Sequence, residues 1–267
     1  MTPEEAKFIL EHDSGMGCQL ARLSLRHENG MWKTLFDAGL PTAIRKNSGA
    51  RNDLLYTVGH LKNTANAVTV LRAILDDIKP KQRAALFTLE RQGSVLITDW
   101  LGAIGRLPDA KGSNLPDEKG IAHFRALAEV VNAYGIELNT TYHAKGRRGG
   151  SFETSVLSQA VSDVMSQGYN DPRNIQKSEQ MELIWQLSPK LDDATKIHVL
   201  QDVSIERVDA VVTLFQKNGW ARREDWLSAA GSPRVNKQTV AYLQAKVAME
   251  AVEEVTRVAS RTLAAKR

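Results

Sequence analysis

The chain has 267 residues, of which 42% are hydrophobic and 25% are charged. This composition excludes the disordered and fibrous classes, and the length allows one large domain or two small ones, each with a buried core. The formal net charge of +4 is compatible with a nucleic-acid partner but does not demand one, so the placement of the charges has to decide.

The cysteine content and the apolar runs indicate where the protein resides. Cys18 is the single cysteine, so an internal disulfide is excluded. The first residues lack the basic start, apolar core and cleavage site of a secretion signal. Apolar runs such as "AVTVL" are far shorter than the roughly 20 residues that cross a bilayer. We therefore expect a cytoplasmic protein with no membrane partner.

Helical patterns begin at the start of the chain. Thr2, Pro3 and Glu5 have the order of an N-cap, a first helical residue and a capping-box partner. Between Cys18 and Gly39 the apolar spacing predicts two short helices, broken at "ENG".

The stretch "IRKNSGARND" then has the composition of a basic turn. It contains Arg45, Lys46 and Arg51, and Asn52 or Asp53 could cap the helix that follows. Because helix N-termini attract anions, these three cations are candidate nucleic-acid-binding residues that would contact phosphate. The alternative is an ordinary basic loop.

Apolar residues step by three and four from Asp53 to Ile78, the strongest helical signal in the chain. Gly59 interrupts this pattern, so either one kinked helix or two helices are possible. The stretch "KPKQRAALFTLERQG" predicts another helix, with Pro80 in its first turn and Gly93 as its stop. The following "SVLIT" predicts a short strand.

Clean strand-like alternation flanks the basic stretch "KGRRGG" and predicts a β-hairpin. The alternating residues are Ile136, Leu138, Thr140 and Tyr142 before it, and Phe152, Thr154 and Val156 after it. A long closing helix is expected from about Asn236 to Ala264. The sequence therefore predicts a mainly α fold: a multi-helix protein with one β-hairpin and a long C-terminal helix.

Two segments of the chain resemble each other, "FTLERQGSVLITDWLGAIG" and "VTLFQKNGWARREDWLSAAG". They share the Asp-Trp-Leu triplet around Trp100 and Trp226, and glycines at matching offsets. A duplication explains this match, and chance similarity of amphipathic helices is the alternative. If the duplication is real, we expect both tryptophans to be buried core residues.

The order helix, strand-like link, helix, helix, hairpin over residues 82–156 resembles winged-helix DNA-binding domains, with "KGRRGG" at the tip of the wing. This resemblance implies nucleic acid as the partner and favours DNA over RNA. Two features depart from the pattern. The turn "RLPDAKGSNLPDEKG" is long, and Asp117 and Glu118 would lie near phosphates. The expected parts are a helical region 1–79, a winged-helix-like unit 80–158 and a helical region 159–267.

The hairpin tip is the main candidate site. Glycines permit turn conformations and close backbone approach, while the cations displace counterions from phosphates. The candidate nucleic-acid-binding residues here are Lys145, Gly146, Arg147, Arg148 and Gly149. The alternative is a solvated turn whose charges keep the tip soluble.

Apolar residues cover a wide arc of the closing helix, which predicts a homo-oligomer or a subunit of a larger assembly. No residues show the spacing of a catalytic or metal site, so we expect no cofactor. The sequence therefore favours a non-enzymatic nucleic-acid-binding protein led by phosphate contacts. A helical adaptor that binds proteins, and an enzyme acting on a phosphorylated or nucleic-acid substrate, are the alternatives.

Overall fold

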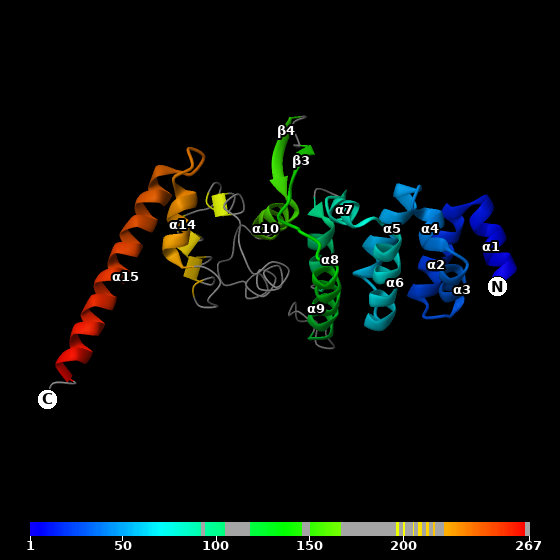
Figure 1. The fold of residues 1–267 in the computed structure, drawn as a ribbon, viewed down its shortest axis with the longest axis horizontal. Coiled ribbons are helices and arrows are strands. Elements are labelled where there is room, and N and C mark those ends of the chain that lie inside the picture. The colour runs from blue at the N-terminus through cyan, green and yellow to red at the C-terminus, as the bar shows by residue number, and fades with distance from the viewer. Residues whose placement is uncertain are drawn as a thin grey trace. The chain divides into compact units, whose positions relative to one another are not determined.

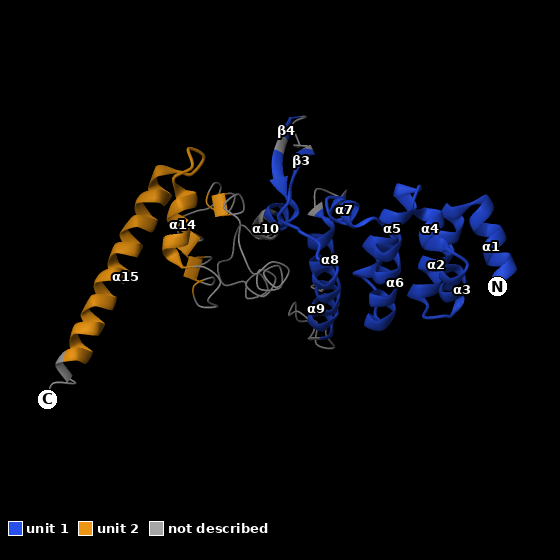
Figure 2. Ribbon diagram, in the orientation of Figure 1, with its two compact units in different colours: residues 1–169, 174–188 blue, residues 170–173, 189–267 orange. Residues whose placement is uncertain are grey.

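The computed structural model describes residues 1–91, 94–104, 118–145, 150–166 and 222–264, with single residues and pairs between 196 and 216. It is mainly α-helical, with a β-hairpin and a long closing helix, which confirms the predicted fold class (Figure 1). The chain divides into two compact units: residues 1–169 with 174–188 form unit 1, and residues 170–173 with 189–267 form unit 2 (Figure 2). The boundaries expected near residues 80 and 158 stay a prediction. None of the helices in the described part has the length and apolarity needed to cross a membrane.

Unit 1 begins with four helices. The predicted capping box is present, since the Glu5 amide donates to the Thr2 hydroxyl at 3.2 Å and the Glu5 carboxylate accepts from the Thr2 amide at 2.7 Å. Gly39 ends the third helix with φ of 100°, a left-handed conformation that glycine adopts without strain. These helices are α1 (Pro3–His12), α2 (Ser14–Arg26), α3 (Met31–Asp37) and α4 (Leu40–Ile44).

The strong helical signal that follows forms two helices, α5 (Ser48–Val58) and α6 (Thr64–Asp77), so the two-helix alternative is confirmed. The chain breaks at Gly59, where a Cβ atom would lie 2.2 Å from Cδ1 of Trp100. No side chain fits at that distance, so the indole packs directly on the backbone of residue 59.

The helix start expected at Asn52 or Asp53 is wrong. Asn47 is the N-cap of α5, and its side-chain oxygen accepts from the amide of Ala50 at 3.1 Å. This cap satisfies a free amide of the first turn and allows the helix to begin at Ser48. The basic turn is therefore shorter than predicted, and Arg51 lies on α5.

The single helix expected between Pro80 and Gly93 is also wrong. The chain instead forms α7 (Pro80–Arg83), a 3-10 turn (Ala84–Leu86) and the short strand β1 (Glu90–Arg91). Tertiary contacts override the helical pattern. Phe87 is fully buried with its ring 5.9 Å from that of Trp100, and the Tyr56 hydroxyl donates to the carbonyl of Leu89 at 2.9 Å.

Strand β2 (Ser94–Val95) pairs with β1 and is shorter than "SVLIT" predicts, because Leu96 already begins α8 (Leu96–Ile104). A buried carboxylate stabilises this start. Asp163 accepts from the amide of Val95 at 3.3 Å and from the hydroxyl of Thr98 at 3.2 Å. A negative charge at a helix N-terminus is favourable.

Helix α9 (Glu118–Ala133) leads to a β-hairpin, which confirms the prediction in a shorter form. Ile136 and Leu138 precede the first strand, and Val156 already begins a helix. Strands β3 (Thr141–Lys145) and β4 (Ser151–Ser155) pair antiparallel, with Thr141 opposite Ser155 and Lys145 opposite Ser151. Helix α10 (Val156–Ser166) follows. Helix α5 contacts α6 and α8, and α9 contacts the same two helices. The large buried side chains on these four helices are Leu54, Leu55, Leu71, Trp100 and Phe124.

Unit 2 contains α14 (Arg223–Ala230) packed against the long helix α15 (Lys237–Ala264). Trp226 of α14 and Leu243 of α15 are fully buried. Both Trp100 and Trp226 are core residues, as predicted. Most of the second repeat segment before Arg222 lies outside the described residues, so the duplication itself stays a prediction.

Candidate anion-binding site

The first group of predicted site residues, Lys145 to Gly149, begins at the last residue of strand β3. Lys145 is the last residue of β3, and its backbone pairs with that of Ser151. Gly146, Arg147, Arg148 and Gly149 lie outside the described residues. Their role in binding stays a prediction, on a hairpin that is itself confirmed.

The second predicted group leads to a hollow of about 560 Å³ in unit 1. It lies where the ends of α4 and α6 meet α5, α7 and the 3-10 turn. Its lining combines three cations, one carboxylate and one amide with apolar side chains. The lining residues are Arg45, Arg51, Asp77, Ile78, Lys79, Gln82, Ala85 and Leu86.

The sequence brings these residues together by ending helices at nearby points. Helix α4 stops before Arg45, helix α6 stops at Asp77, and Pro80 starts α7 directly after Lys79. Proline favours the first turn of a helix because it has no amide hydrogen to leave unpaired there. The cations therefore come from three separate segments and converge on one hollow.

Asp77 is already engaged within the site. Its Oδ1 accepts a hydrogen bond from the Thr42 hydroxyl at 2.8 Å, and its Oδ2 lies 3.9 Å from Nε of Arg45. This carboxylate holds the Arg45 side chain by attraction and leaves the hollow with an excess of two positive charges.

Arg51 carries a buried donor that has no acceptor among the described residues. Its Nη1 donates to the carbonyl of Arg45 at 3.3 Å, but its Nε is buried and has no hydrogen-bond partner among the described residues. Burial lowers the pKa of the Arg51 guanidinium from its usual value, the direction expected when a charge loses water. The site therefore contains a desolvated donor that an anionic oxygen would satisfy.

Arg83, next to the hollow in sequence, is already engaged elsewhere. Its Nε donates to the carbonyls of Leu75 and Ile78, at 2.9 and 3.1 Å, and its guanidinium lies 4.9 Å from the centre of the Tyr134 ring. It thereby satisfies carbonyls at the end of α6 and fixes the backbone just before Lys79.

Two of the three residues predicted for this corner line the hollow, and their role in binding stays a prediction. Arg45 and Arg51 line the hollow, whereas Lys46 is exposed and does not line it. Sequence reasoning missed Lys79 and Gln82, which it assigned to a longer helix. The basic stretch "KPKQR" was the available signal for them.

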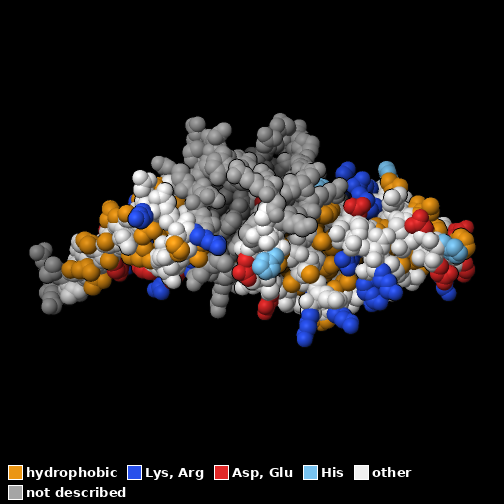
Figure 3. Space-filling view, turned by 90° about the horizontal axis from the view of Figure 1, so that it is seen from above, with side chains coloured by type: hydrophobic (Ala, Val, Ile, Leu, Met, Phe, Trp, Pro, Cys, Tyr) orange, Lys and Arg blue, Asp and Glu red, His pale blue; other side chains and the backbone are white. Residues whose placement is uncertain are grey.

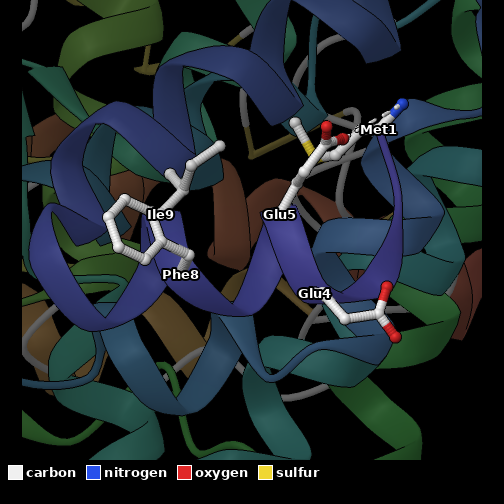
Figure 4. Close-up of a pocket in the computed structure, with 5 residues that line it drawn as sticks. All are labelled: Met1, Glu4, Glu5, Phe8 and Ile9. Carbon is white, nitrogen blue, oxygen red and sulfur yellow. Dashed lines mark ion pairs between the residues drawn. The ribbon is translucent and has the colours of Figure 1, made fainter.

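A second hollow, of about 480 Å³, lies on α1 and differs in chemistry (Figure 4). Its two charged side chains are both glutamates, so it repels anions. It is lined by Met1, Glu4, Glu5, Phe8 and Ile9. On the face drawn in Figure 3, the described lysine and arginine side chains stand in several separate groups.

Two other groups that could carry chemistry are structural. In "GWARREDW", Arg223 and Trp226 are buried, while Trp220 lies outside the described residues. Cys18 donates its thiol to the carbonyl of Ala50 at 3.0 Å, and burial raises its pKa to about 11. A thiol that stays protonated at neutral pH is a poor nucleophile.

Among the described residues, no three His, Cys, Asp or Glu side chains gather as a metal site requires.

Comparisons of the chain with protein-family models, curated proteins and solved structures found no match. The function is therefore inferred from the geometry and chemistry of the site.

Proposed function

We propose that this protein binds nucleic acid through phosphate contacts and that it is not an enzyme. The observation that carries the proposal is the convergence of Arg45, Arg51 and Lys79 on one hollow, where the Nε of Arg51 has no acceptor among the described residues. Arginine forks match phosphate oxygens and lysine adds a point charge. The hairpin of β3 and β4 supports the proposal, because the sequence between its two strands carries two further arginines among glycines.

The resemblance of residues 82–156 to winged-helix domains makes DNA the favoured nucleic acid, although α7, a 3-10 turn and β1 replace the helix expected at its start. The expected cytoplasmic location remains part of this proposal. Binding led by phosphate contacts is insensitive to base sequence and strongly dependent on salt. Both properties can be measured with labelled duplexes of unrelated sequence.

Replacing Lys145, Arg147 and Arg148 together by alanine should weaken binding to unrelated duplexes alike. Each phosphate contact contributes about 0.9 to the slope of log affinity against log salt, so the slope should flatten by about 2.7. Fluorescence anisotropy over a salt series measures it. The fold should survive, because exposed turn charges usually contribute within about 0.5 kcal/mol.

A matched control removes three exposed cations from α1 to α3, by Lys7→Ala, Arg26→Ala and Lys33→Ala. This control loses the same charge and should keep nearly the wild-type slope. An unchanged slope in the hairpin variant would remove the hairpin from the binding site. No binding of the wild type at low salt would overturn the proposed function.

The exposed face of α15 favours a second candidate function, assembly with another copy of the chain. Its apolar residues alternate at spacings of four and three, the pattern of a coiled-coil seam, and all are exposed. They are Ala241, Ala245, Ala248, Val252, Val255 and Ala259. Val252 and Val255 are 65% and 69% exposed. On another face of the helix, Leu243 is buried and the half-buried Glu250 pairs with Arg223 of α14.

We expect Val252→Glu with Val255→Lys to abolish this assembly, because charges in an apolar seam lose water without gaining partners. Light scattering should give at least twice 29.5 kDa for the wild type and 29.5 kDa for the variant. The control, Glu253→Lys with Ser260→Glu, places one charge of each sign on the polar side of the same helix and should assemble normally. A wild type that is monomeric at all concentrations would contradict the assembly.

A further inference from the structure

The hollow at Arg51 has a shape and charge that distinguish one kind of phosphate from another. We propose that it binds a phosphate monoester, in particular the terminal phosphate of a nucleic-acid strand. The strand as ligand rests on the proposed function, whereas the preference for a monoester rests on the hollow alone.

Charge is the first argument. Three cations and one carboxylate line the hollow, which leaves an excess of two positive charges. A monoester carries between about 1.5 and 2 negative charges at neutral pH, while a phosphodiester within a strand carries one. The hollow therefore matches the charge of a terminal phosphate and exceeds that of an internal one.

Shape is the second argument. The cations come to the hollow from three separate segments of the chain: Arg45 after α4, Arg51 on α5 and Lys79 before α7. A phosphodiester continues into a sugar on both sides, so it suits an open groove or a ridge. A monoester has one substituent and three free oxygens, so it can enter a concave site and contact donors on several sides.

The unsatisfied donor is the third argument. The Nε of Arg51 is buried without a partner among the described residues, and its Nη1 is held by the Arg45 carbonyl. The guanidinium is therefore oriented before any ligand arrives. An oxygen that accepts from Nε would remove the penalty of a buried, unpaired donor. The amide of Gln82 adds a neutral donor to the same lining.

Asp77 lowers the excess positive charge of the hollow from three to two. Its Oδ1 accepts from the Thr42 hydroxyl, while its Oδ2 lies 3.9 Å from Nε of Arg45 and is buried with no hydrogen-bond partner among the described residues. This charge opposes any nearby anion, so the three cations have to outweigh it and a second phosphate is disfavoured.

The test compares one short oligonucleotide in three forms, with a 5′-phosphate, with a 3′-phosphate and with hydroxyl groups at both ends. Anisotropy of an internal label gives the affinity of each form. We expect one phosphorylated form to bind about ten-fold more tightly than the hydroxyl form, the equivalent of one charge-assisted hydrogen bond. Inorganic phosphate should compete this preference away.

Arg51→Lys keeps the charge and removes the fork, so the preference should fall to about two-fold or less while binding of the hydroxyl form persists. Lys79→Met, at an exposed position, tests the same site without disturbing a partly buried side chain. The matched control is Lys81→Met, which removes an exposed neighbouring cation that does not line the hollow. It should keep the full preference.

The outcomes separate the two proposals. If strands bind but neither terminal phosphate improves binding, the monoester site is wrong and the proposed function stands. If no strand binds, the proposed function fails, and calorimetry with inorganic phosphate and a mononucleotide tests the hollow by itself. Heat from wild type that is lost in Lys79→Met supports the site, and no heat from wild type overturns it.

Discussion

Replacing Trp100 by alanine is expected to destabilise unit 1 by about 3–5 kcal/mol, the usual loss for a large aromatic core residue. Trp100 is 1% exposed and its ring meets Phe87 edge to face at 5.9 Å. Its Nε1 donates to the buried carbonyl of Leu55 at 2.9 Å. Alanine would leave a cavity and an unpaired carbonyl together, and such a loss is comparable to the whole stability of many domains.

Hydrogen exchange measured by mass spectrometry can locate this effect. Exchange should accelerate in α5, α8 and α9, which form the core around Trp100, while α14 and α15 of unit 2 provide an internal reference. Trp100→Phe keeps most of the packing and loses only the donor, so it should destabilise by about 1–3 kcal/mol. An alanine variant that loses under about 1 kcal/mol would show that the indole is not a core anchor.

Arg223→Met is expected to destabilise unit 2 by about 3–5 kcal/mol, because it leaves two acids without their cation. The Arg223 side chain is 8% exposed and pairs with Asp209 at 3.1 Å and with Glu250 of α15. It also donates to the Thr213 hydroxyl at 3.0 Å. The guanidinium therefore links α14 to Glu250 of α15 and to Asp209 and Thr213, which precede α14 in the chain.

Chemical denaturation and exchange in α14 and α15 measure this loss. Arg222→Met is the matched control, because Arg222 is exposed and only its backbone amide, which the change keeps, donates to Asp225 at 2.7 Å. It should stay near the wild type. Equal losses in both variants would indicate that positive charge on α14, and not the buried pairing of Arg223, sustains the unit.

The same cluster gives unit 2 a dependence on pH. Hydrogen bonds from Tyr242 and Arg223 lower the pKa of Asp209, so its contribution is present above the usual carboxyl pKa and is lost as pH falls through the lowered value. Burial and the bond to Asp209 raise the pKa of Tyr242 to about 12. Its contribution is complete below the ordinary tyrosine pKa of about 10 and is lost as pH rises toward the raised value.

Local patterns predicted much of the fold, because capping, periodicity and alternation act within a few residues. The capping box at Thr2, the two helices on either side of Gly59 and the hairpin at Lys145 are all of this kind. The helix from Pro80 failed because contacts of Phe87 and Leu89 with distant residues outweighed local propensity.

The candidate site was predicted only in part for the same reason. Arg45 and Arg51 were visible as a basic cluster in one stretch of sequence. Lys79 joins them only because α6 brings its far end back to α4, where Arg45 faces Asp77 at 3.9 Å. The burial of Arg223 likewise depends on acids at positions 209 and 250, which no local pattern relates to it.

The contact between Gly59 and the indole of Trp100 also constrains how this sequence can diverge. A methyl group at position 59 would lie 2.2 Å from the ring, so any larger residue there requires a smaller residue at position 100. The two positions should therefore change together or remain unchanged during evolution. If a side chain appears at position 59 first, the variant is overpacked against Trp100. If the tryptophan becomes smaller first, the clash is avoided, but the fold has to tolerate a cavity.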